Sequence, residues 1–156
     1  MNTKQIEKRI STIAQREGRR PRILLAHLES DQSDHWTKSL AASLAEFGFD
    51  VDIGPNNQAP LQTARLAIDN DVHMMCVSIV DINNQPLVVQ LAEMLQAEGG
   101  ADIQLVAGGA GLQPNHEELY RAGVDLIVDF DKSNITLMGR MLALLDETHG
   151  KLKPKI

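Results

Sequence analysis

The sequence has little cysteine, no long apolar run and no excess of basic residues. Its single cysteine, Cys76, has no partner for a disulfide within the chain, which favours a reducing, cytoplasmic setting. No apolar run reaches the roughly 18 residues of a membrane span, and Met1–Ser11 lacks the apolar centre of a signal peptide. The net charge of −6 argues against nucleic acid or an anionic membrane as the main partner.

The composition is that of one globular domain. A chain of 156 residues with 43% hydrophobic and 23% charged residues can bury a core without disulfides or metals. We expect an N-terminal helix and linker in residues 1–20, one α/β domain in 21–147 and a tail in 148–156. Arg19–Arg22 is expected to be a solvated linker, and Cys76, inside an apolar run, to be a buried structural thiol.

Apolar segments of two periods alternate along the chain, and they are separated by glycine and proline. Strands are predicted at 22–28, 50–53, 72–80, 103–107 and 124–128, and helices at 3–17, 37–47, 60–70, 86–97, 114–122 and 134–147. This alternation predicts a five-stranded parallel sheet of the flavodoxin-like order 2-1-3-4-5, with helices on both faces plus the N-terminal helix. Any ligand is then expected at the loops 28–36, 80–86, 107–114 and 129–134.

The N-terminal helix is predicted to be amphipathic. Ile6, Ile10 and Ile13 recur at helical spacing, with charged residues between them, and Gly18 ends the pattern. This apolar stripe must cover either the sheet of its own domain or a partner. We therefore treat the helix as a candidate docking element.

Four segments carry a resemblance to a known family. They are 22–26, the Leu44–Pro55 run with Phe-Gly-Phe-Asp-Val-Asp-Ile-Gly-Pro, 70–73, and Gly108-Gly109. Together they resemble the cobalamin-binding domain of methylmalonyl-CoA mutase and related acyl-CoA mutases, over roughly residues 21–147. The resemblance implies the fold predicted above, a cobalamin cofactor, and a larger mutase subunit or self-association as partner.

The resemblance also implies three cofactor-binding motifs, of which the first is degenerate here. The family has Asp-x-His-x-x-Gly, whose His is the lower cobalt ligand; this chain keeps Asp31 but has Ser33 at the His position and Trp36 at the Gly position. An indole there would occupy volume that the tail of the ligand needs. His35 and His27 are the histidines near enough to replace the lost ligand. With the second motif at Ser78–Val80 and the third at Gly108-Gly109, the candidate cofactor-binding residues are Asp31, Ser33, His35, Ser78, Val80, Gly108 and Gly109.

Other patterns at the same edge support rival hypotheses less well. Asp31, Asp81 and Lys132 loosely match the acidic pocket, phosphoacceptor and lysine of a response-regulator receiver domain. Asp31, Ser33 and His35 include the residue types of a hydrolase triad, but adjacent loop residues rarely converge. Gly108–Gly111 lacks the Gly-Lys-Ser/Thr of a phosphate loop. Trp36 is also a candidate stacking platform for a planar ligand.

Two hypotheses of different classes follow. In the first, the chain is a non-catalytic homologue that keeps the fold and the partner surface, has lost His-on cobalamin ligation, and serves as a structural or regulatory subunit. In the alternative, it is a functional corrinoid-binding subunit of an adenosylcobalamin-dependent acyl-CoA mutase, an isomerase whose chemistry the cofactor carries. In neither is a catalytic residue or a protein metal-ligand set assigned to this chain.

Overall fold

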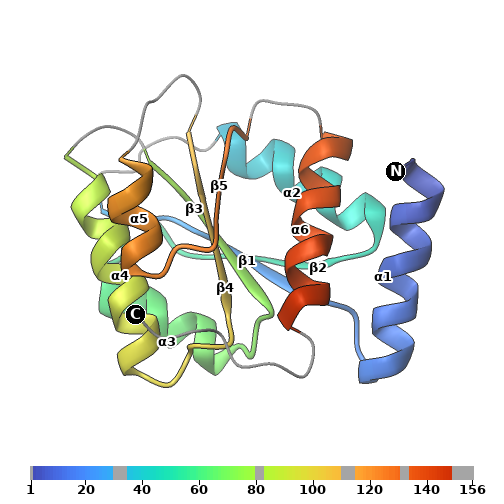
Figure 1. Ribbon diagram of the computed structural model, residues 1–156, viewed down its shortest axis with the longest axis horizontal. Helices are drawn as coiled ribbons and strands as arrows, with labels where there is room; N and C mark the ends of the chain where they lie inside the picture. Colours follow the sequence, from blue (N-terminus) through green and yellow to red (C-terminus); the bar gives the residue numbers. More distant parts are fainter. Residues whose placement is uncertain (1, 30–34, 80–82, 110–114, 131–133, 149–156) are drawn as a thin grey trace.

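A five-stranded parallel sheet forms the centre of the protein. The computed structural model describes residues 2–29, 35–79, 83–109, 115–130 and 134–148. The strands follow the order β2-β1-β3-β4-β5, which confirms the predicted flavodoxin-like topology (Figure 1). Their bounds are β1 (Arg22–Ala26), β2 (Asp50–Ile53), β3 (Met74–Ser78), β4 (Gln104–Gly108) and β5 (Leu126–Val128).

Helices cover both faces of the sheet and close two apolar cores. One face carries α2 (His35–Phe47) and α6 (Asn134–Thr148). The other carries α3 (Pro60–Asp69), α4 (Gln85–Ala97) and α5 (His116–Ala122) (Figure 1). β3 and β4 are buried along their whole length, as expected for central parallel strands covered on both sides. No helix in the described ranges is long and apolar enough to cross a membrane.

The N-terminal helix α1 (Thr3–Glu17) lies outside α2 and α6, as an addition to the three layers of helices, sheet and helices (Figure 1). It starts at a capping box, in which the Asn2 side chain accepts from the Gln5 N–H at 2.9 Å, and it ends at Gly18 in the left-handed region (φ 81°). Ile6, Ile10 and Ile13 are buried in the core beneath it. Of the two covers expected for this stripe, the structure shows the one within the domain, and helices α2 and α6 provide the main contacts.

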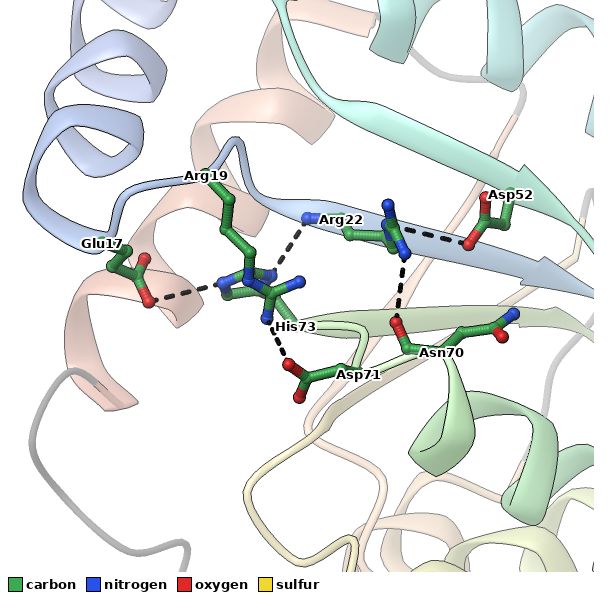
Figure 2. Close-up of polar contacts among 7 residues, drawn as sticks. All are labelled: Glu17, Arg19, Arg22, Asp52, Asn70, Asp71 and His73. Carbon is green, nitrogen blue, oxygen red and sulfur yellow. Dashed lines mark hydrogen bonds and ion pairs between the residues drawn. The ribbon is translucent and has the colours of Figure 1, made fainter.

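The segment after α1 is anchored, not a solvated linker as expected from its composition. The Arg20 guanidinium donates to the Gly48 carbonyl at 3.2 Å. Arg22 donates to the Asn70 carbonyl at 3.3 Å, and its Nε lies 3.9 Å from an oxygen of Asp52 (Figure 2). These contacts fix the entry into β1.

β2 has the predicted bounds, and the other four strands differ from theirs by one or two residues, for local reasons. β3 begins after Val72 because the Val72 N–H donates to the Ala67 carbonyl at 3.2 Å and so belongs to the exit turn of α3. Asp71 in that turn has a positive φ of 52°. At the other end of β1, Leu28 forms only an isolated bridge with Gln58. Hydrophobic periodicity does not distinguish the apolar residues of a strand from those of an adjacent turn, so the first, third and fifth predicted strands are too long.

Candidate functional site

The carboxyl ends of the strands form the edge where this fold class binds ligands. Of the candidate residues, Asp31, Ser33 and Val80 lie outside the described residues, as do Asp81 and Lys132 of the receiver-domain hypothesis. The structure brings Ser78 and Gly108 together as register partners at the ends of β3 and β4, and the Ile79 N–H donates to the Gly108 carbonyl at 2.7 Å. His35 is the first residue of α2, two residues before the predicted start of this helix, and Gly109 directly follows β4.

Gly108 lies where β4 and the segment after β5 approach each other closely. An ideal Cβ at this position would overlap the carbonyl oxygen of Val128 and would lie 3.0 Å from Cε2 of Phe130. The space that the missing side chain leaves is therefore taken by the protein's own backbone and by an aromatic ring. Packing alone requires glycine here.

Trp36, the second residue of α2, is part of the core. Its side chain is 7% exposed and stacks on the ring of Phe130, with centroids 4.8 Å apart and planes at 10°. The centroid of the His27 ring lies 5.9 Å from the indole. Among the described residues, the indole Nε1 has no hydrogen-bond partner. Phe130 was not among the predicted site residues, although it lies in the predicted ligand loop 129–134; the sequence signal for it is an aromatic residue two positions after the last strand.

His27, which follows β1, is held by hydrogen bonds at both ring nitrogens. Nδ1 lies 3.2 Å from the Gly54 carbonyl, which only accepts, so Nδ1 carries the hydrogen. Nε2 then accepts from the Thr37 hydroxyl at 2.8 Å. The His27 ring is buried and hydrogen-bonded at both nitrogens, so it has a packing role and offers no free nitrogen to a metal ion. Within the described ranges, no group of three or more His, Cys, Asp or Glu residues could hold a metal ion.

Cys76 is inert, as predicted. It is fully buried in β3, and burial raises the pKa of its thiol to about 12. The reactive form of cysteine is the thiolate, which this pKa excludes at neutral pH.

The sheet order and the polar strand ends define a flavodoxin-like α/β domain of the kind that binds ligands at the carboxyl edge of its strands. A family model described as the B12 binding domain matches residues 21–134. The chain belongs to this family.

Relatives with similar sequences are methylmalonyl-CoA mutases. The chain is 41% identical over 123 residues to the probable mitochondrial methylmalonyl-CoA mutase of Caenorhabditis elegans, and 42% identical over 117 residues to the mitochondrial methylmalonyl-CoA mutase of Mus musculus. These matches cover 79% and 75% of this chain but only 16% of each relative. The chain thus spans about a sixth of the length of these relatives.

Solved structures with low sequence identity share the fold. A cobalamin-binding protein from Desulfitobacterium hafniense superposes with a TM-score of 0.65 at 17% identity, covering 92% of this chain and 67% of that chain. The receiver domain of a Francisella response regulator gives 0.62 at 15% identity, covering 82% and 98%. At these identities the likeness concerns the fold alone.

The family implies a cobalamin cofactor, and two of the described positions at the carboxyl edge bear on how much room such a group would find. The indole of Trp36 is stacked against Phe130, so this part of the edge is filled by side chains. The side of Gly108 that lacks a Cβ faces Val128 and Phe130, not an open cradle.

Proposed function

We propose that this chain is a B12-binding-type domain that has lost His-on cobalamin ligation and acts as a non-catalytic structural or regulatory partner of a larger mutase subunit. The observation that carries the proposal is the stacked pair of Trp36 and Phe130, at 4.8 Å, in the position where the resemblance places a glycine. Ser33, at the position of the cobalt-ligating histidine, supports it from the sequence.

The physical basis is a competition for one volume. A buried aromatic side chain covers roughly 150–250 Å² and gains about 0.5–1.5 kcal/mol from an aromatic partner beyond that burial. A ligand tail entering between α2 and β5 would have to displace this stack. It would then meet a hydroxyl at Ser33, which is a poor substitute for an imidazole oriented by a carboxylate. Binding would therefore lose the free energy of the aromatic stack and would not gain the bond between cobalt and an imidazole.

The alternative is a functional corrinoid-binding subunit of an adenosylcobalamin-dependent acyl-CoA mutase. It is favoured by Gly108-Gly109, which the chain retains, and by about 40% identity to methylmalonyl-CoA mutases. A receiver-domain function has no such support beyond the shared fold.

Visible spectroscopy separates the two candidates. The protein is mixed with hydroxocobalamin or adenosylcobalamin at high micromolar concentration, desalted and scanned. We expect no retained colour and no rise in the melting temperature, because a ligand that does not bind the native state cannot stabilise it. Retained colour with a base-off spectrum would instead establish the corrinoid-binding subunit.

Variants test whether Trp36 is the obstacle. We expect Ser33→His with Trp36→Gly to retain corrinoid, whereas Ser33→His alone does not. Trp36→Gly alone, checked for folding by circular dichroism, is the matched control because it opens the volume without supplying the ligand. Equal retention by the single Ser33→His variant would remove Trp36 from the explanation, and so would failure of a folded double variant.

Partnership is tested by mixing the chain with the large subunit of a methylmalonyl-CoA mutase and following co-elution in size-exclusion chromatography. We expect a complex whose formation does not depend on added cobalamin. Separate elution at all concentrations tested would count against a role as structural partner.

A further inference from the structure

Positive charge is concentrated in α1 and in the segment that follows it. Residues 1–22 contain seven Lys or Arg and two Glu residues, whereas the rest of the chain contains eight Lys or Arg and 19 Asp or Glu residues. α1 lies at one end of the longest axis of the molecule, and α4 and α5 lie toward the other end (Figure 1). A basic helix thus bounds one end of a protein whose net charge is −6.

The cations Lys4, Lys8 and Arg16 form a row on the outer side of α1. All three are exposed and, with Thr12 between them, they recur every four residues, so they lie along the side of the helix opposite the buried isoleucines. Among the described residues, no carboxylate forms an ion pair with any of the three. We call these three residues the basic row.

The N-terminal half of the basic row opposes the formation of its own helix. Lys4 and Lys8 are like charges four residues apart, which repel each other on a helix surface. Lys4 also stands in the first turn, where the helix dipole favours negative charge, and this turn has no acidic residue. Arg16, in the last turn, suits the dipole. Local choices that oppose a fold are expected where a surface has another role, and a row of cations fits contact with an acidic surface.

An acidic surface of this kind lies on the opposite face of the same molecule. The stretch 85–122 contains five acidic residues and one basic residue, Arg121, which pairs with Glu117. Between α4 and α5 runs a groove of about 630 Å³, on which Glu93 and Glu118 are exposed. Neither of these two carboxylates forms an ion pair with a described residue. The lining of this acidic groove also includes Val89, Gln96, Ala97, Arg121 and Ala122.

We propose that the basic row of one copy of this chain docks on the acidic groove of a second copy. The long side chains of the row place their charged groups beside Glu93 and Glu118 and lay their aliphatic parts on Val89 and Ala122. The net charge of −6 does not prevent this contact, because charges more than about 8 Å apart are largely screened in physiological salt. An extended polyanion, by contrast, would also meet the acidic remainder of the chain.

The proposed contact joins two different surfaces, so it is heterologous. Each copy in a pair keeps one free basic row and one free acidic groove, and the assembly is therefore open at both ends. Neither surface includes the carboxyl edge of the strands, so the inference is independent of the proposed function.

Sedimentation velocity of the full chain at low and high salt tests the docking. We expect the weight-average sedimentation coefficient to rise with protein concentration at about 20 mM salt and to stay at the monomer value at about 500 mM salt, because salt screens the attraction between exposed charges. A monomer at every concentration in low salt would overturn the proposal, and so would an association that does not respond to salt. Binding of the chain to heparin without self-association would assign the basic row to a polyanion and would also overturn it.

Paired charge reversals locate the two surfaces. The row variant, Lys4→Glu with Lys8→Glu, should weaken self-association at least about tenfold, and so should the groove variant, Glu93→Lys with Glu118→Lys, because each places like charges across the contact. Circular dichroism checks the fold of both; Lys4→Glu suits the helix dipole, so the row variant should keep α1. Wild-type association of either variant would refute the docking.

A control and a mixture complete the test. Lys38→Glu with Arg140→Glu makes the same change in net charge as the row variant, at exposed positions of α2 and α6, and should associate as the wild type does. The row variant keeps its acidic groove and the groove variant keeps its basic row, so an equimolar mixture should form complexes that neither protein forms alone. A mixture that sediments as monomers would overturn the pairing of these two surfaces.

Discussion

Gly108 is a candidate ligand contact by resemblance and a packing residue by geometry. The sequence placed it directly after the fourth strand, and in the structure it is the last residue of β4, beside Ser78. It could not reveal that Val128 and Phe130 fill the space beside it, because that contact depends on how closely β5 approaches β4. The same limit applies to the stack of Phe130 on Trp36, two residues that are distant in the chain.

Gly108→Ala is expected to destabilise the protein by about 1–3 kcal/mol, because the new Cβ overlaps a backbone carbonyl, which cannot rotate away as a side chain does. Urea unfolding followed by circular dichroism measures the difference. The matched control is Gly139→Ala in α6, where a Cβ meets no atom within 4 Å. Alanine should stabilise that helix by about 0.5–1 kcal/mol. If both variants unfold at the same urea concentration as the wild type, β4 and β5 do not approach each other as closely at Gly108 as the structure shows.

At the scale of elements, hydrophobic periodicity carried most of the prediction. It found all the strands and helices of the described fold, since each buries a face with its own repeat. The role of α1 was the exception. A stripe such as Ile6, Ile10 and Ile13 indicates that one face of a helix is buried, but it does not identify the element that covers this face. Only the arrangement of α2 and α6 shows that the cover is internal.

Ile10→Ala tests whether α1 belongs to the cooperative fold. The Ile10 side chain is 2% exposed on the inner face of α1. Its truncation should lower the free energy of unfolding by about 2–5 kcal/mol, depending on how far the surrounding residues close the cavity. Ser11→Ala, at the next and exposed position, should change stability by less than about 0.5 kcal/mol. Both are measured from urea unfolding curves. Equal midpoints for the two variants would mean that α1 docks separately from the rest of the domain.

At the scale of the whole molecule, the sheet separates two polar edges with different chemistry. At the carboxyl edge, the described residues include an aromatic stack and His27, whose ring is hydrogen-bonded at both nitrogens. At the amino edge, charged residues surround a neutral His73 (Figure 2). From the sequence, His27 was considered as a possible replacement ligand. Both rings have structural contacts, and burial lowers the pKa of His73, which links the stability of the whole fold to pH.

The direction of that linkage follows from the lowered pKa of His73. Below about pH 6.5 the unfolded chain binds a proton at this residue more readily than the folded protein does, so acid favours unfolding. The stabilisation is complete above pH 6.5 and is lost as the pH falls toward the folded-state pKa, with a slope of at most about 1.4 kcal/mol per pH unit. Urea midpoints at pH 7.5 and 5.5 should therefore differ more for the wild type than for His73→Gln, in which this position does not titrate. Carboxylates contribute equally to both proteins, so the difference between the two pH effects isolates His73. A larger pH effect in the variant would mean that His73 gains, instead of loses, proton affinity on folding.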